Sequence, residues 1–196
     1  MLVHCSLPIL IAAAFLLGGC GHMPVTSMIR LARADLANTD PAQLRAAVKL
    51  PRVLKPQPQR VTLRLGVRTA DAHEEVQDFT LRELSDSEDV VALRAETDAN
   101  THIFAYRLDP DEIVRFAAFR DSLKKRQEAS GRRGGAISIS IAAKACRTGD
   151  LPDRPVYVTT YLRTAETGDY VPLLRDLDLR TIAPGRDVAA EIPPCG

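Results

Sequence analysis

The sequence predicts a mainly β or α+β domain, built as an antiparallel sheet or sandwich with one main helix over about residues 110–129. Three observations support this prediction. Several segments alternate between apolar and polar residues, short turn-forming clusters separate them, and a single long stretch has helical periodicity. Charged residues make up 26% and hydrophobic residues 45% of the 196 positions, which is typical of a globular domain.

The first part of the chain, up to residue 68, is expected to hold two strands. Residues 27–35 are predicted to form the first strand, and Asp40 with Pro41 then begins a single helical turn, because Asp caps a helix and Pro suits its first position. Residues 51–58 contain three prolines and are predicted to form a stiff, irregular connector. Residues 61–68 alternate strictly and predict a half-buried strand.

The rest of the chain is expected to contain the helix between further strands. Residue Asp109 serves as an N-cap, followed by Pro110 at the first position and Glu112 at the third. One stripe of the helix is expected to face the sheet, and the glycines after residue 130 end it. The stripe contains Ile113, Phe116, Ala117, Arg120 and Leu123. Strands are predicted at residues 76–84, at 90–97 and 102–108 as a hairpin after an acidic turn at 85–89, and at 136–143, 156–164 and 173–181.

The first twenty residues carry a targeting signal. All Lys, Arg, Asp and Glu residues lie after Cys20, and residues 7–19 form an apolar run that is too short to span a bilayer by preference. The run ends in Leu17-Gly18-Gly19-Cys20, which resembles the lipobox of bacterial lipoproteins. The segment before it lacks the Lys or Arg common in signal peptides. A plain secretory peptide with an incidental cysteine is the alternative.

The lipobox resemblance implies how the chain is processed and where it resides. It implies that residues 1–19 are a signal peptide and that Cys20 receives a diacylglycerol on its thiol and an acyl chain such as palmitate on its amino group. Residues 20–26 would be a lipidated tether, and residues 27–196 a single exported globular domain in the cell envelope, facing the periplasm. The residue after Cys20 is Gly21 and not Asp, which by the same resemblance favours the outer membrane over the inner one.

Export also decides how the other cysteines are interpreted. Cys5 would leave with the signal peptide, so Cys146 and Cys195 remain as an even pair in an oxidising compartment. A disulfide between them is predicted, because neither has a CxxC neighbour or a nearby His that would indicate a metal or redox site.

Other residue patterns give no catalytic, metal or cofactor site. The residues His73, Glu74 and Glu75 lie in a predicted turn without the second His of a zinc-binding helix, and a solvated loop is expected there. The chain contains no phosphate-binding or nucleophile motif, so no cofactor is predicted and an enzyme is disfavoured. A formal net charge of +1 argues against a nucleic-acid partner.

Two groups of residues could form a partner surface. The tyrosines Tyr157 and Tyr161 share a face of one predicted strand, where cross-strand packing is the alternative. Five cations lie at the helix end, where they would also suit the helix dipole. They are Lys124, Lys125, Arg126, Arg132 and Arg133.

Together these patterns predict a lipid-anchored envelope protein with a non-enzymatic binding, structural or accessory domain. Its expected partners are the membrane, through the anchor, and either another envelope protein or anionic lipid head groups. The alternative is an envelope enzyme or enzyme accessory whose site is assembled from distant strands.

Overall fold

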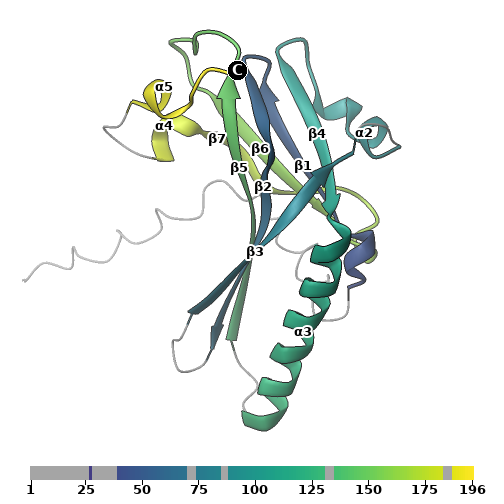
Figure 1. The fold of residues 1–196 in the computed structure, drawn as a ribbon. Coiled ribbons are helices and arrows are strands. Elements are labelled where there is room, and N and C mark those ends of the chain that lie inside the picture. The colour runs from purple at the N-terminus through teal and green to yellow at the C-terminus, as the bar shows by residue number, and fades with distance from the viewer. Residues whose placement is uncertain (1–26, 28–38, 70–73, 85–87, 131–134, 183–186) are drawn as a thin grey trace, which may run out of the picture.

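A computed structural model of the chain describes residues 27, 39–69, 74–84, 88–130, 135–182 and 187–196. It contains one antiparallel sheet of seven strands, curled into a half-barrel, and one long helix (Figure 1). The prediction of a mainly β or α+β fold is confirmed, as a single curled sheet with a helix. The elements are η1 (Pro41–Gln43), β1 (Arg45–Pro51), β2 (Leu54–Thr69), β3 (Glu74–Glu83), α2 (Glu88–Ala92), η2 (Arg94–Glu96), β4 (Thr101–Leu108), α3 (Pro110–Ser130), β5 (Gly135–Arg147), β6 (Tyr157–Arg163), β7 (Val171–Asp178), α4 (Leu179–Ile182) and α5 (Val188–Glu191).

The strands lie in the order β5-β2-β3-β4-β1-β6-β7, so that β5 and β7 form the two edges. Strand β1 lies inside the sheet and pairs antiparallel with both β4 and β6. No strand at these positions was predicted from the sequence. The stretch is short and begins directly after the helical turn at Asp40, whose side chain caps that turn as predicted by accepting a hydrogen bond from the Ala42 backbone N–H at 2.9 Å.

The core lies on the concave side of the sheet and is closed by α3. Alternate strand residues such as Val48, Leu63 and Leu162 are completely buried there. Helix α3 packs against them through Phe116, whose ring centroid lies 5.1 Å from that of Phe79 on β3. The helix and the stripe predicted from the sequence are both confirmed, since Phe116 is buried and the other four stripe residues are partly buried.

The predicted hairpin of residues 90–97 and 102–108 is wrong in its first strand. Residues 88–96 form α2 and η2, and β4 pairs instead with β1 and β3. Strand β1 occupies one side of β4 along its length, and β3 pairs with the other side only at Tyr106–Leu108. The β-branched pair Val90 and Val91 suggested a strand locally, but Leu93 packs as part of a short helical segment on the outer face of the sheet.

The predicted irregular connector at residues 51–58 is also wrong, because β2 begins at Leu54 and runs through two prolines. Opposite Pro56 the strand pairs with β5 only, and the pairing with β3 begins at Thr62. Proline is tolerated where one edge of a strand has no neighbour. The register shifts between Pro56 and Val61, and Gln59 has a φ of 57°, so a β-bulge absorbs this stretch.

The remaining strands follow the predictions with small differences. The strand predicted at residues 173–181 ends at Asp178, whose carboxylate accepts the backbone N–H of Arg180 at 3.1 Å and so starts α4. Of the strand predicted at residues 27–35, only Ser27 is among the described residues, and it is buried. The acidic turn at residues 85–89 lies mostly outside the described part of the chain.

Candidate functional site: an arginine row on the outer face

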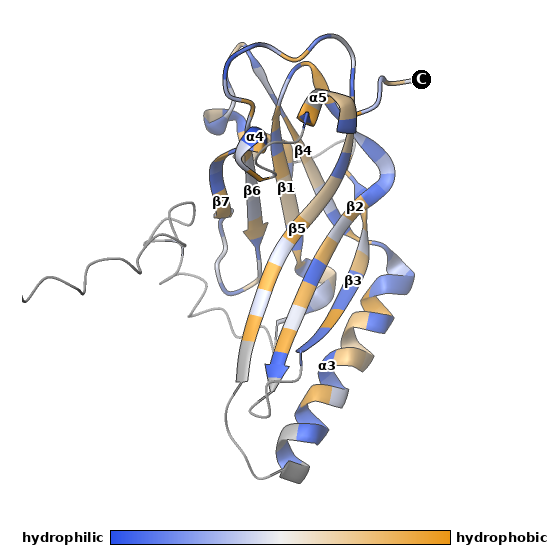
Figure 2. Cartoon of the chain, turned by 90° about the vertical axis from the view of Figure 1, so that its left-hand side faces the viewer, coloured by the Kyte–Doolittle hydropathy of each residue, from blue (hydrophilic) through white to orange (hydrophobic). Residues whose placement is uncertain are grey.

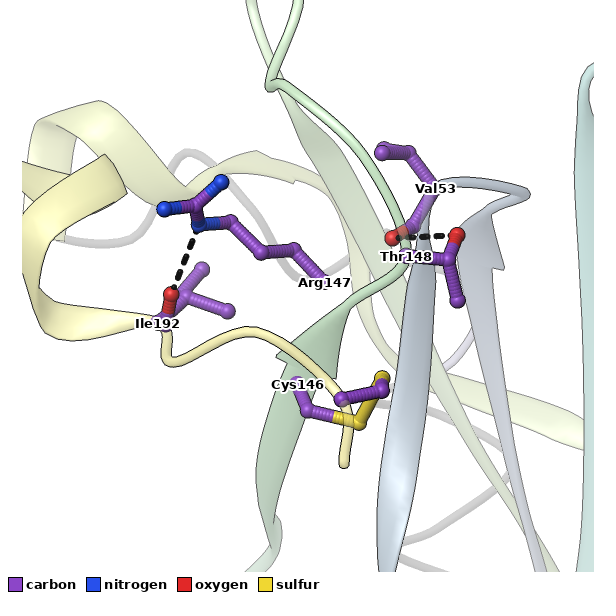
Figure 3. Close-up of a disulfide and its surroundings, with 6 residues drawn as sticks. Val53, Cys146, Arg147, Thr148 and Ile192 are labelled. Atoms are coloured by element: carbon purple, nitrogen blue, oxygen red, sulfur yellow. Dashed lines mark hydrogen bonds between the residues drawn. A yellow bond between two sulfur atoms is a disulfide. The ribbon is translucent and has the colours of Figure 1, made fainter.

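The predicted disulfide joins Cys146 at the end of β5 to Cys195, with a Cα–Cα distance of 5.0 Å (Figure 3). Hydrogen bonds fasten the same segment on both sides of the bridge. The backbone N–H of Arg147 donates to Pro193 O at 2.8 Å, and the backbone N–H of Cys195 donates to Arg147 O at 2.8 Å. Arg147 Nε also donates to the carbonyl of Ile192 at 3.1 Å. The bridge therefore holds residues 192–195 against the outer end of β5.

The residues predicted as a partner surface lie on different sides of the sheet. Tyr157 is 52% exposed, whereas Tyr161 is only 1% exposed and offers almost no surface to a partner. Lys124, Lys125 and Arg126 lie on α3, which covers the concave side. Arg126 pairs with Glu75 on β3 at 2.7 Å and so fastens the helix to the sheet. The structure does not bring the tyrosines and the cations into one surface.

The other two predicted cations, Arg132 and Arg133, and the lipidation residue Cys20 lie outside the described residues, as does His73. Within the described ranges, no three His, Cys, Asp or Glu side chains come together as metal ligands would. None of the helices in those ranges is both long enough and apolar enough to cross a membrane.

Four arginines form a row across the outer face of the sheet, which we call the arginine row. On neighbouring strands, Arg82 lies opposite Arg107, Arg107 opposite Arg45, and Arg45 opposite Arg163. Residues directly opposite each other in an antiparallel pair point to the same face, with Cβ atoms about 5 Å apart. Strands β3, β4, β1 and β6 therefore each place one guanidinium at the same level.

Like charges directly opposite one another destabilise a sheet, and in half of the row two arginines share one carboxylate, which offsets part of their repulsion. Asp89, on α2, is 8% exposed, and its Oδ1 lies 2.7 Å from Arg163 Nη1. Its Oδ2 accepts a hydrogen bond from Arg45 Nε at 3.3 Å. Arg45 also donates to the carbonyls of Ala42 and Leu44, which fixes its guanidinium in place. Asp89 thus bridges two arginines that the sheet register sets opposite each other.

The segment that carries Asp89 is held on the same face at two further points. Leu93, 1% exposed, packs against Ala47 and Tyr161. Beyond it, Glu96 accepts a hydrogen bond from the Tyr161 hydroxyl at 2.8 Å and lies 3.3 Å from Arg175 Nη1 on β7. Burial raises the pKa of Tyr161, and the bond to Glu96 adds to the rise, so the phenol stays protonated and donates. Residues 88–96 therefore contact the outer face of the sheet through an acidic residue (Asp89), then an apolar one (Leu93), and then a second acidic one (Glu96).

The other half of the row is open. Arg82 and Arg107 are both exposed, and no carboxylate among the described residues pairs with either of them. Their arrangement repeats that of Arg45 and Arg163, since both pairs lie directly opposite on neighbouring strands. Within the described part of the chain, the row is thus one pair of guanidinium groups bridged by Asp89 and, beside it, one pair without a carboxylate partner.

Sequence reasoning missed this row because each of its arginines is isolated in the chain. No cluster of basic residues contains Arg45, Arg82, Arg107 or Arg163. Only the pairing register brings them together, and that register depends on β1, which was not predicted. The acidic residues at positions 86–89 were visible, but were interpreted as a turn.

The comparisons with known proteins give no relative: no family model, no curated protein and no solved structure matches the chain.

Proposed function

We propose that the protein is a lipid-anchored, non-enzymatic accessory protein of the bacterial cell envelope, which binds the acidic segment of another envelope protein through the open half of the arginine row. The binding part of the proposal rests on one observation: Asp89 already bridges the neighbouring pair of opposite arginines. A carboxylate from a partner would meet Arg82 and Arg107 in the same arrangement, with charge-assisted hydrogen bonds from both.

The surroundings of the open pair favour a side-chain carboxylate over a membrane surface. The adjacent site is filled by an Asp on a short helical segment, flanked by an apolar contact at Leu93. A partner segment with the same sequence of acidic and apolar residues would lie alongside residues 88–96. A row of four guanidinium groups, two of which share the negative charge of Asp89, offers less net charge than a lipid-binding polybasic patch usually has.

Anchoring and export are supported by the lipobox and by the disulfide. The pair Cys146–Cys195 is the kind of bridge that persists in an oxidising compartment such as the periplasm. Several acyl chains on Cys20 would hold the protein stably at the membrane, because each buried CH₂ contributes about 0.8 kcal/mol and one chain alone binds only marginally.

Substitution Cys20→Ser is expected to abolish labelling of the protein by radioactive fatty acid and to release it from the membrane fraction, because a serine hydroxyl cannot form the thioether. The measurement is fractionation of cells that express the full chain. Cys5→Ser serves as the control and should change neither result. Retention of the Cys20→Ser protein in membranes would contradict the proposed anchor.

Exchange of Arg82 and Arg107 for Gln is expected to weaken binding of an acidic probe peptide rich in Glu and Leu. Each substitution should weaken it about tenfold, since one hydrogen bond to a charged group contributes about 1.5 kcal/mol. The measurement is fluorescence anisotropy of the labelled peptide with the full chain in detergent. Arg60→Gln removes an exposed arginine outside the row and should leave the affinity unchanged.

Vesicles with anionic lipids provide the second arm of that experiment. Cosedimentation with vesicles that is lost in the Arg82→Gln, Arg107→Gln protein, without binding of the peptide, would assign the open pair to lipid head groups and contradict a protein partner. Equal peptide binding by the double variant and by Arg60→Gln would remove the arginine row from the proposal.

A further inference from the structure

Among the described residues, strand β5 has no neighbour along most of its outer edge. It lies at the end of the sheet, and the only backbone contact on its free side that the described residues make is at Arg147, where residues 193–195 are fastened. Between Gly135 and Ala145 the edge faces no other described strand. Natural proteins usually protect such edges with charges or prolines, yet Lys144 is the single charged residue between Gly135 and Cys146, and that stretch contains no proline.

The free stretch of β5 has a palindromic sequence. Residues 136–142 are Ala-Ile-Ser-Ile-Ser-Ile-Ala, which is the same in both directions about Ile139. A two-fold axis through an antiparallel strand pair sets each residue opposite its counterpart at the same distance from the axis. With the axis at Ile139, Ile137 would lie opposite Ile141 of a second copy and Ser138 opposite Ser140. Like meets like at all seven positions, and Lys144 stays outside the paired stretch.

The side chains on this stretch have one apolar face that is incompletely covered. Ile137, Ile139 and Ile141 lie opposite Val67, Leu65 and Leu63 of β2, and so point to the side of the sheet on which α3 packs. Helix α3 reaches that side at β3, through the ion pair of Arg126 with Glu75. On the β5 side the cover ends, and Ile137 is 52% exposed. A second copy on the free edge would extend the apolar face with three more isoleucines.

The overall shape leaves room for such a pair. Figure 2 shows β5, β2 and β3 extending side by side beyond the rest of the sheet, with β5 at the open edge and α3 on the far side of β3. In an antiparallel arrangement about Ile139, the bodies of the two copies would lie at opposite ends of the joined strands. The three projecting strands of each copy would then lie side by side in one continuous sheet, with both α3 helices on the same face.

We infer that the protein forms a symmetric homodimer by antiparallel pairing of β5 with β5 of a second copy, centred on Ile139. Backbone hydrogen bonds along the edge supply the attraction, as in other cases of strand addition, and the palindrome selects a second copy of this chain as the partner. This inference is independent of the arginine row, which lies on the opposite face of the sheet and on other strands.

The first test places a thiol on the proposed axis. In cells that express the full chain with Ile139→Cys, a short bismaleimide should link two copies, because residues opposite each other on the axis have Cα atoms about 5 Å apart. Val114→Cys is the matched control, since Val114 is an apolar residue, 71% exposed, on α3. A band at twice the chain mass for Ile139→Cys and not for Val114→Cys supports the dimer. Equal bands, or linkage of residue 139 to a different protein, would overturn it.

The second test examines the register with exposed residues, so that folding is not at risk. The variant Ser138→Glu, Ser140→Glu sets like charges opposite each other at two symmetric places. The variant Ser138→Glu, Ser140→Lys sets opposite charges at the same places. The dimer dissociation constant of the full chain in detergent, from analytical ultracentrifugation, should differ between the two variants on the order of tenfold or more, the Glu pair being weaker. Equal constants, or a wild-type protein that is monomeric at all concentrations, would refute the pairing.

Discussion

Replacement of both Cys146 and Cys195 by serine is expected to lower the free energy of unfolding by about 4 kcal/mol. The bridge closes a loop with a sequence separation of 49 residues, and cross-linking a loop of that length removes about this much chain entropy from the unfolded state. The backbone hydrogen bonds of Arg147 with Pro193 and Cys195 would then have to hold the segment alone. Residues 192–195 should therefore detach before the sheet unfolds.

Urea denaturation of the oxidised wild type and of the double serine variant measures this loss. Reduction of the wild type under native conditions should reproduce the midpoint of the variant, which separates the effect of the bridge from that of the substitutions. Amide hydrogen exchange at position 195 should be faster in the variant than in the oxidised wild type. A midpoint shift in urea of less than a quarter of that expected would show that the native segment is held mainly by its hydrogen bonds.

Substitution Asp89→Ala is expected to lower the free energy of unfolding by about 3 kcal/mol, the lower end of the range for breaking a buried ion pair, because both guanidinium groups keep some contact with water. The loss has two parts. Arg45 and Arg163 lose their shared carboxylate, and they then face each other across β1 and β6 as unscreened like charges. Thermal and urea unfolding of the full chain would both measure it.

A second substitution distinguishes these two parts. If the repulsion contributes, Arg163→Gln added to Asp89→Ala should restore part of the stability, although Arg163→Gln alone destabilises the wild type. The matched control is Asp150→Ala, which removes an exposed carboxylate that lies 3.5 Å from Arg147 and should cost less than 1 kcal/mol. If Arg163→Gln does not raise the stability of the Asp89→Ala protein, repulsion between Arg45 and Arg163 makes no contribution to the loss.

The features that could be predicted from sequence are those with a local cause. Helix α3 follows from the predicted cap at Asp109 and from a stripe that spans about three turns, and the second half of β2 follows from strict alternation. The disulfide was predicted by counting, since the expected processing would leave two cysteines. These signals lie within a few residues of the structure they produce.

The features that could not be predicted depend on distant pairing. Strand β1 owes its place to β4 and β6 on either side, and the alternation of residues 45–51 is too short to show it. Residues 90–97 contain β-branched residues, but they form short helical segments in which Leu93 packs against Ala47 and Tyr161 of distant strands. The arginine row could not be predicted because of both errors. Without β1 in the sheet and Asp89 on its outer face, the four arginines are scattered surface residues.

The position of β1 has a consequence for the way in which the chain folds. Its partners are β4, with Arg107 opposite Arg45, and β6, with Arg163 opposite the same residue. The middle of the sheet therefore closes only when segments more than a hundred residues apart have met, and such a high contact order gives slow folding, on the order of milliseconds to seconds. Until β6 arrives, β1 exposes one whole strand edge. If the chain is exported from its amino end, as proposed, it would pass through that stage every time, and its topology would couple export to folding.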